Sequence, residues 1–545
     1  MTSSHLLEFC IVILGFMLVI GVGVAASRWR RPETMLALEE WGLGGRAFGN
    51  GVIFFLLGGD LYTAYTFVAI PALVYGVGAQ GFFVVAFAVI AYPLVFVALP
   101  RMWSVAHVHG FVTPAEFVRA RFGSRSLSTL VAIAAIVATM PYIAIQLVGL
   151  QVVLQAMGVG GDLPLIVAFA VMALFTFNSG LRAPALIAIV KDLLLLVALL
   201  TILLWFTVTQ GGWHEVFHMA ALHFQNPKLG GGLLLSRGGQ IGYVSLALGS
   251  ALAIFLYPHA ITGALAARNR ATVQRSMATL PIYTVMLGVF ALLGFAAISA
   301  EVRPPGGNIN GVLPQLLQSG LNSWAVGLAF AALGIGALVP AAIMSIGAAN
   351  LFTRSIYRPY IRPNATASQE AWVSKTTSLL VKLGAIAVIL LVNPQFAIDL
   401  QLMGGVIILQ VFPAVALGLF TNWFHRRALF AGIIAGLAAG LVMLYQIPTL
   451  GPGTTILGSH FGGDSWPLSH LGLPAGVSIY AGIVALAVNL AVAYAGTLMC
   501  QRRGIPRGED ITKPGDYVAD EEDSKLRRMS ELVDGPVRYQ ARHMR

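Results

Sequence analysis

A short polar segment, Gly58-Gly59-Asp60, interrupts an apolar run that is otherwise long enough to cross a membrane. Residues that carry hydroxyl groups follow it directly, in the order Leu61-Tyr62-Thr63-Ala64-Tyr65-Thr66. Adjacent glycines weaken a helix, and a carboxylate at hydrocarbon depth is tolerated only where it faces protein or water. The segment therefore predicts a broken spanning helix, the kind of element that forms the binding sites of secondary transporters.

The composition places the rest of the chain in a membrane. Of its 545 residues, 57% are hydrophobic and 10% are charged, whereas soluble globular proteins average roughly 25% charged residues. Apolar runs of about 20 residues recur along nearly the whole length, which indicates one polytopic bundle rather than several soluble domains. We identify no soluble catalytic domain.

The formal net charge of +11 does not indicate nucleic-acid binding, because the basic residues lie in short clusters between apolar runs. Cys10 and Cys500 lie near opposite ends of the chain, so their spacing predicts neither a disulfide framework nor a metal site. The first apolar run, Leu6 to Ala26, is longer than a signal core and is followed by arginines, so we interpret it as a retained span.

Apolar runs predict about thirteen spanning helices. They lie near 5–26, 50–76, 81–100, 127–156, 163–179, 184–209, 240–265, 277–300, 322–350, 374–393, 396–421, 427–447 and 474–499. Basic clusters follow the odd-numbered spans, so the positive-inside rule predicts an external amino terminus and a cytoplasmic carboxyl terminus. Residues 501–545 are interpreted as a solvated cytoplasmic tail, and Thr449 to Leu473 as an external loop or cap without an assigned function.

Six short motifs occur in one order along this pattern, and together they resemble the sodium:solute symporter family. They are Trp41-Gly42-Leu43-Gly44-Gly45-Arg46, Tyr75-Gly76-Val77-Gly78, Thr113-Pro114-Ala115-Glu116-Phe117, Gly180-Leu181-Arg182-Ala183, Leu265-Ala266-Ala267-Arg268 and Ala341-Ala342-Ile343-Met344-Ser345. The segments Gly59 to Thr63, Ala183 to Asp192 and Leu400 to Pro413 resemble the monocarboxylate permease branch. The resemblance covers roughly residues 40–425.

The resemblance implies an all-α polytopic membrane protein with a five-plus-five inverted-repeat core, the amino-acid/sodium symporter-like fold. We expect a first helix and loop over 1–39, a transport core over 40–425, two accessory helices over 426–500 and the tail over 501–545. Within the core, repeat one spans about 50–209 and repeat two about 240–421. A second break is expected at Tyr257-Pro258-His259, because proline removes a backbone donor.

The first break could hold a small carboxylate such as lactate, pyruvate, acetate or propionate, through exposed backbone N–H groups and the positive ends of the half-helices. The substrate-binding residues that we expect are Gly59, Tyr62, Thr63, Tyr65, Thr66, Gln146, Tyr257 and Gln401. For the hydroxyl and amide groups the alternative is that they tie neighbouring helices together. His259 could relay protons, or could cover carbonyl groups that Pro258 frees.

Two charged residues are candidates for ion coupling, Asp60 and Lys191. Asp60 could attract a cation or bind a proton, or be a carboxylate held by backbone N–H groups. Lys191 stands where many family members carry glutamine, and could complement a substrate anion or repel a second cation. Its alternative is to snorkel to the cytoplasmic end or to pair with Asp192.

The sodium site implied by the resemblance maps onto carbonyl groups of Gly58, Leu61 and Ala342 and onto the Ser345 hydroxyl. The second hydroxyl position is Ile346, which offers no side-chain oxygen to a hard cation. Sodium and protons therefore both stay open as coupling ions, and no cofactor is expected.

We expect a cation-coupled secondary active symporter of the cell inner membrane that imports a short-chain monocarboxylate by alternating access. A symporter of another small solute, such as an amino acid, is the alternative. A membrane-embedded enzyme or respiratory subunit is disfavoured, because histidines are scattered and neither HExxH nor DDxxD is present. The oligomeric state is not indicated.

Overall fold

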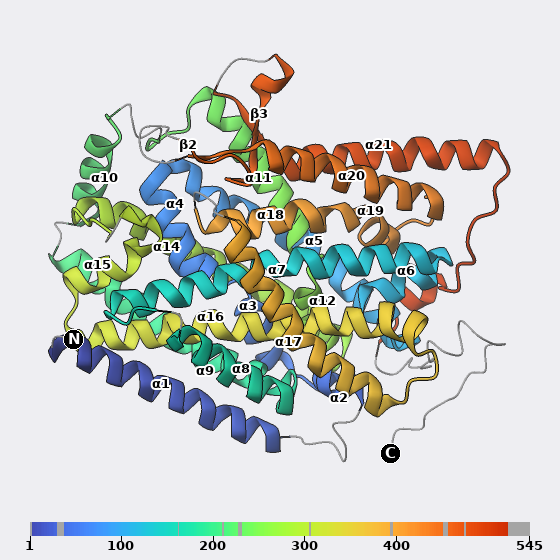
Figure 1. Ribbon diagram of the computed structural model, residues 1–545, viewed down its shortest axis with the longest axis horizontal. Helices are drawn as coiled ribbons and strands as arrows, with labels where there is room; N and C mark the ends of the chain where they lie inside the picture. Colours follow the sequence, from blue (N-terminus) through green and yellow to red (C-terminus); the bar gives the residue numbers. More distant parts are fainter. Residues whose placement is uncertain are drawn as a thin grey trace.

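The computed structural model describes residues 3–29, 37–161, 163–209, 212–226, 231–304, 307–392, 396–450, 456–472 and 476–520. These residues form helices almost throughout, and their long axes run broadly along one direction (Figure 1). The predicted all-α polytopic architecture is confirmed.

The first half of the chain contains ten helices among its described residues. They are α1 (Ser3–Arg28), α2 (Leu38–Leu43), α3 (Asn50–Gly58), α4 (Ile70–Val77), α5 (Phe83–His109), α6 (Pro114–Phe122), α7 (Arg125–Ala156), α8 (Leu163–Ser179), α9 (Arg182–Thr209) and α10 (Gly212–His223). A π-helical turn, η2 (Tyr65–Ala69), precedes α4.

The second half adds α11 (Arg237–Ile254), α12 (Pro258–Leu265), α13 (Arg270–Thr279), α14 (Pro281–Ser299), α15 (Val312–Gly320), α16 (Ser323–Phe352), α17 (Ala367–Leu391), α18 (Ile398–Ile408), α19 (Phe412–Val415), α20 (Arg426–Gln446) and α21 (Ala481–Arg502). Two small antiparallel pairs lie between α20 and α21: β1 (Thr449–Leu450) with β2 (Ile456–Gly458), and β3 (Ser465–Pro467) with β4 (Ser478–Tyr480).

Within the described ranges, ten helices are long and apolar enough to cross a membrane, or eleven when α11 and α12 count as one bent span. The predicted count of thirteen is therefore not confirmed. The expected segment 50–76 fails the length criterion because α3 and α4 are separate short helices, and segment 163–179 contains only the 17 residues of α8. The chain is a multi-pass membrane protein.

Both predicted interruptions lie inside the bundle. The first separates α3, which ends at Gly58, from η2, which begins at Tyr65. Gly58 allows close packing there, because a Cβ atom at this position would collide with the ring of Tyr283. The second separates α11 from α12 by three residues with a bend of 44°, and Pro258 is the first residue of α12.

Helix α16 lies at the centre of the bundle and α1 at its edge (Figure 1). The most apolar window of α16 is 94% buried, against 22% for that of α1. Since α16 packs against α7, α9, α12 and α17, it supports the elements that carry the two breaks.

The two ends of the bundle differ. One carries α10 and the strands, and the other carries α2, α6 and the chain that follows α21 (Figure 1). At this second end, Arg354 lies 3.6 Å from Glu116 and 3.2 Å from Glu370, which also lies 3.2 Å from Arg358. These ion pairs join α6 and α17 to the segment after α16.

Part of the tail packs against the bundle around Tyr517, while most of residues 501–520 are exposed, so the expectation of a solvated tail is corrected only locally. Asp516 Oδ2 lies 2.7 Å from the buried His109 Nε2, and Ile511 N–H donates to Ala120 O over 3.1 Å. Tyr517 is buried, with the guanidinium of Arg121 5.2 Å from its ring centre. A single aromatic anchor and short polar contacts hold a segment that lacks apolar periodicity. Residues 521–545 lie outside the described ranges.

Candidate substrate and cation site

The first helix break is held by a lysine from α9. Lys191 Nζ donates hydrogen bonds to Gly59 O over 2.5 Å and to Tyr62 O over 2.7 Å. The same ammonium lies 3.1 Å from Asp192 Oδ1, and the Tyr283 hydroxyl donates to Asp192 Oδ2 over 2.7 Å. Lys191 is fully buried, so it pairs with Asp192 but does not snorkel to an aqueous surface. The lysine satisfies carbonyl groups that the break removes from the helix.

A glutamine from α7 satisfies the other side of the break. The Gln146 side-chain oxygen accepts a hydrogen bond from Ala64 N–H over 3.0 Å, and its amide donates to Tyr142 O over 3.4 Å. Gln146 is buried. In this structure the amide ties α7 to the break, and the substrate-binding role expected for Gln146 stays a prediction.

The hydroxyl groups after the break have different partners. Thr63 Oγ1 accepts from Tyr65 N–H over 3.1 Å, and the Thr66 hydroxyl donates to Leu61 O. The Tyr62 hydroxyl is buried and has no hydrogen-bond partner among the described residues. The threonines therefore stabilise the local backbone, whereas Tyr62 retains an unused donor.

Asp60 and His259 connect the two breaks. His259 Nε2 lies 3.0 Å from Asp60 Oδ2, and the histidine ring is buried. Asp60 lies in the first break and His259 directly follows the second, so residues about 200 positions apart in the sequence meet at the centre. A small cavity of about 60 Å³ borders Asp60 and Leu61, which exceeds the roughly 10–15 Å³ that one water molecule needs.

Tyr257 and Gln401 contact each other next to this pair. The Tyr257 hydroxyl donates to Gln401 O over 3.1 Å, and the Gln401 side-chain oxygen is buried without a partner among the described residues. The ring of Tyr142 lies 5.1 Å from that of Tyr257 and 5.3 Å from that of His259. Gln146, which bonds the backbone of the first break, also donates to Tyr142 O. Tyr142 therefore connects the residues of the second break to the glutamine that holds the first.

The residues of the expected sodium site form two internally bonded pairs. Leu61 N–H donates to Gly58 O over 2.9 Å, and the Ser345 hydroxyl donates to Ala342 O over 2.8 Å. Ile346, which follows Ser345 in the chain, is fully buried and offers no side-chain oxygen. A cation bound here would have to compete with these hydrogen bonds for its carbonyl ligands.

Sequence reasoning missed the roles of Tyr142 and Tyr283, and favoured a structural role for His259. Tyrosines in apolar helices give no local signal, because their partners come from distant elements. For His259 a signal was available, since it follows a proline break as Asp60 follows a glycine break.

Two interrupted helices that meet at the centre of a polytopic bundle, with buried charges at the meeting point, define the inverted-repeat class of secondary transporters. A family model described as "Sodium:solute symporter family" matches residues 41–436. The chain belongs to this family, which confirms the resemblance noted in the sequence.

Relatives and a solved structure extend this assignment. The chain is 45% identical to a monocarboxylate transport permease protein of Rhizobium johnstonii, over 89% of this chain and 95% of the relative. It is 33% identical to the uncharacterized symporter YodF of Bacillus subtilis, over 81% and 88%. The structure of a Na⁺-coupled sialic acid symporter in a substrate-bound outward-open state superposes with a TM-score of 0.71, at 17% identity, over 90% of this chain and 98% of that one. This last likeness shows the five-plus-five inverted-repeat fold.

Proposed function

We propose that the protein imports a short-chain monocarboxylate, of the lactate, pyruvate, acetate or propionate class, by cation-coupled symport around the first helix break. Similarity to a monocarboxylate permease supports the substrate class. The observation that carries the proposal is the way Lys191 covers the carbonyl oxygens of Gly59 and Tyr62. Those oxygens would repel an anion, and once they are covered the break presents donors, among them the unpartnered Tyr62 hydroxyl.

The substrate contacts proposed are the break residues Gly59, Tyr62, Thr63, Tyr65 and Thr66, together with Gln146, Tyr257 and Gln401 from the surrounding helices. The unpartnered oxygen of Gln401 supports a contact with a protonated group of the substrate or with a water molecule. The threonines would contribute only after their present hydrogen bonds rearrange.

Coupling to a cation follows from charge. An elementary charge that moves across a potential of 100 mV changes energy by about 2.3 kcal/mol, so uptake of an anion alone is opposed by an inside-negative membrane. The Asp60–His259 pair offers a place for a proton, and the pairs Gly58–Leu61 and Ala342–Ser345 offer oxygens to sodium. Lys191 pairs with Asp192 in either case, so this pair adds no net charge to the balance. We propose Na⁺ or H⁺ as the coupling ion.

We further propose that the protein resides in the cell inner membrane with its amino terminus outside. The basic residues that support this orientation gather at the end that carries α2, α6 and the tail. With that orientation, the strands and α10 face outward and the ion pairs of Arg354 close the cytoplasmic end.

A symporter of the same fold for another small solute, such as an amino acid, is the second candidate. The carboxylates of Asp192, which pairs with Lys191, and of Asp60, which pairs with His259, lie near the break. Either carboxylate offers acceptors to a substrate amino group. A membrane-embedded enzyme is disfavoured by membership of a transporter family.

The test is uptake of radiolabelled pyruvate, lactate, acetate and alanine into proteoliposomes under an imposed sodium gradient or an imposed proton gradient. We expect accumulation of at least one monocarboxylate under one gradient, and none when an ionophore collapses that gradient. Accumulation of alanine alone would favour the second candidate. Absence of monocarboxylate uptake under both gradients, with folded protein in the vesicles, would refute the proposed function.

A further inference from the structure

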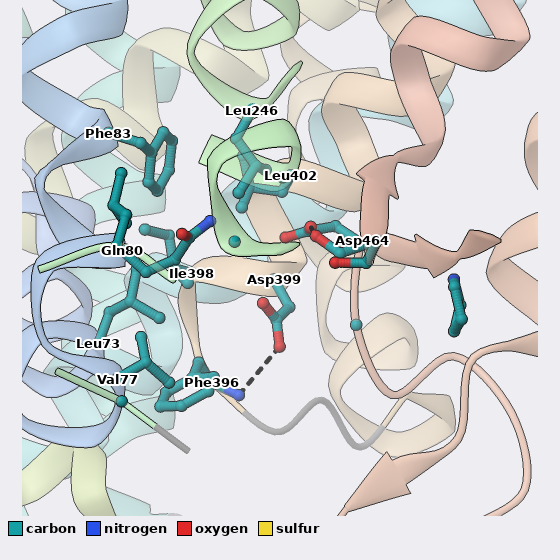
Figure 2. A pocket seen from close by; sticks show the side chains of 18 of the residues that line it. Leu73, Val77, Gln80, Phe83, Leu246, Phe396, Ile398, Asp399, Leu402 and Asp464 are labelled. Carbon is teal, nitrogen blue, oxygen red and sulfur yellow. Dashed lines mark hydrogen bonds between the residues drawn. The ribbon is translucent and has the colours of Figure 1, made fainter. Parts of the chain in front are cut away.

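A large cavity lies at the end of the bundle that carries the strands. Its volume is about 480 Å³, and it is bounded by α4, α11, α18 and the segment between α20 and α21. Leu73 and Val77 of α4 and Leu402 of α18 line it (Figure 2). Helix α4 follows the first break through η2, and the lining residue Leu402 is next to Gln401 in α18, so the cavity lies on the path toward the proposed substrate site.

Two carboxyl groups face this cavity from different elements. Asp399 lies in the first turn of α18, where its Oδ2 accepts from Phe396 N–H over 3.0 Å (Figure 2). Asp464 lies just before β3, and its Oδ1 accepts from the Ser465 hydroxyl over 2.6 Å. Both side chains are buried, 6% and 5% exposed. The two carboxyl groups interact electrostatically, so ionising both of them is unfavourable.

No base offsets these acids at the cavity wall. Among the described residues that line the cavity, Asp399 and Asp464 are the charged types, and no lysine, arginine or histidine accompanies them. With both carboxylates ionised, the cavity would carry two negative charges on side chains largely out of contact with solvent, and an approaching anion would be repelled.

We propose that Asp399 and Asp464 form a proton-binding site at the outer mouth of the transport path, and that its protonation admits the anionic substrate. This inference rests on the proposed function and orientation. Each proton bound from the outer solution reduces the negative charge of the pair by one and lowers the repulsion between the two carboxyl groups. The proton from the outer solution adds to a carboxylate oxygen as an O–H bond, and no other covalent bond changes.

The direction of the pH effect follows from the surroundings of the pair. Burial raises the pKa of the Asp464 carboxyl to about 6, although the hydrogen bond from Ser465 acts in the opposite direction. The other titratable groups in electrostatic contact with Asp464 are the hydroxyls of Tyr65, in η2, and Tyr480, in β4. Tyrosine hydroxyls stay neutral in this pH range, so the two acids account for the change in the charge of the cavity. Because the two carboxyl groups interact, they titrate as a pair.

The experiment measures initial uptake of labelled pyruvate into proteoliposomes as the outer pH varies between about pH 5 and about pH 7.5. Pyruvate stays ionised over this range, so its own titration does not contribute. We expect wild-type uptake to rise several-fold as the pH falls through the range where the pair binds a proton. The Asp464→Asn and Asp399→Asn variants should lose most of this rise. Glu215→Gln changes an exposed acid on α10, at the same end, and should keep the wild-type profile.

A second readout is independent of transport. Infrared difference spectra of the purified protein at the two pH extremes should contain a protonated carboxyl band that disappears in Asp464→Asn. This also covers the case in which a variant folds but transports too slowly to measure.

Unchanged pH profiles in both variants, or a carboxyl band that persists in Asp464→Asn, would overturn the inference while wild-type pyruvate uptake stands. Wild-type protein that takes up no monocarboxylate at any pH would instead refute the proposed function. If that protein still loses the carboxyl band in Asp464→Asn, the proton site stands without its assigned role.

Discussion

The two helix breaks satisfy their freed backbone groups in different ways. At the first, Lys191 from α9 and Gln146 from α7 bond to the backbone of residues 59–64. At the second, Leu256 N–H donates to Ala253 O over 3.0 Å and Ile261 N–H to Tyr257 O over 3.3 Å, so the nearby backbone provides the partners. The first break is a site built from distant elements, and the second is a local bend that brings His259 to Asp60.

This difference predicts that removing the side chains that bond to the backbone of the first break costs both stability and substrate affinity. The largest effect is expected for Lys191→Met. It leaves Asp192 and two carbonyl groups buried without the ammonium, and breaking a buried ion pair costs about 3–5 kcal/mol. We expect a large drop in the thermal unfolding temperature in detergent, and loss of uptake.

The double variant Lys191→Met with Asp192→Asn is the control for this prediction. It removes both charges and keeps an acceptor for the Tyr283 hydroxyl, so part of the lost stability should return. A single variant as stable as the wild type would show that the lysine does not hold the break.

Asp60→Asn should separate transport from coupling. The amide keeps the size of the side chain but cannot form an ion pair with His259. We expect gradient-driven accumulation to fall by at least about tenfold, which corresponds to about 1.4 kcal/mol, while substrate exchange across equilibrated vesicles continues. Equal losses of exchange and accumulation would argue against a coupling role, and His259→Gln should reproduce the pattern of Asp60→Asn.

Gln146→Ala should weaken substrate binding by an intermediate amount. It leaves the buried Ala64 N–H without its acceptor, and an unsatisfied buried group costs about 1–3 kcal/mol. The KM for uptake should rise more than the turnover rate falls. Gln155→Ala, an exposed position in the last turns of the same helix, is the matched control; similar KM values for the two variants would contradict this account of the break.

The smallest effects are expected on removing two tyrosine hydroxyls, one at each break. Tyr62→Phe removes a hydroxyl without a partner among the described residues, so stability should hold while KM rises. Tyr257→Phe removes the hydrogen bond to Gln401 O, a loss of about 1 kcal/mol of stability, with a smaller change in KM. A loss of stability in Tyr62→Phe together with a larger rise in KM in Tyr257→Phe would instead place the substrate at the second break.

The positions of both breaks were predictable, because Gly58-Gly59 and Tyr257-Pro258 are local signals that act on their own backbone. The contacts of the charged side chains were not predictable in the same way. Whether Lys191 snorkels or turns inward depends on the packing of α9 against α3, which no local pattern records. The proximity of Asp399 and Asp464 depends on how the strands fold back over α18, so the sequence indicated a cap there but no chemistry.

The span count shows a related limit. A hydropathy run measures length and apolarity, so it counts residues 50–76 as one span although the polypeptide leaves the helix between Gly58 and Tyr65. The tail shows the opposite case: its composition indicates solvation, yet Tyr517 anchors it against α5 and α6.

Substrate protection of introduced cysteines tests the central claim most directly. Cys10 and Cys500 are the native thiols, so serine replaces both before Thr63→Cys is introduced at the first break and Leu256→Cys at the second. The rate of maleimide labelling is then measured in proteoliposomes with pyruvate, with lactate and with an inert sugar. The account predicts that a monocarboxylate slows labelling of the Thr63→Cys variant more strongly than that of the Leu256→Cys variant, which lies next to the proposed contact Tyr257. Protection confined to the Leu256→Cys variant would contradict it.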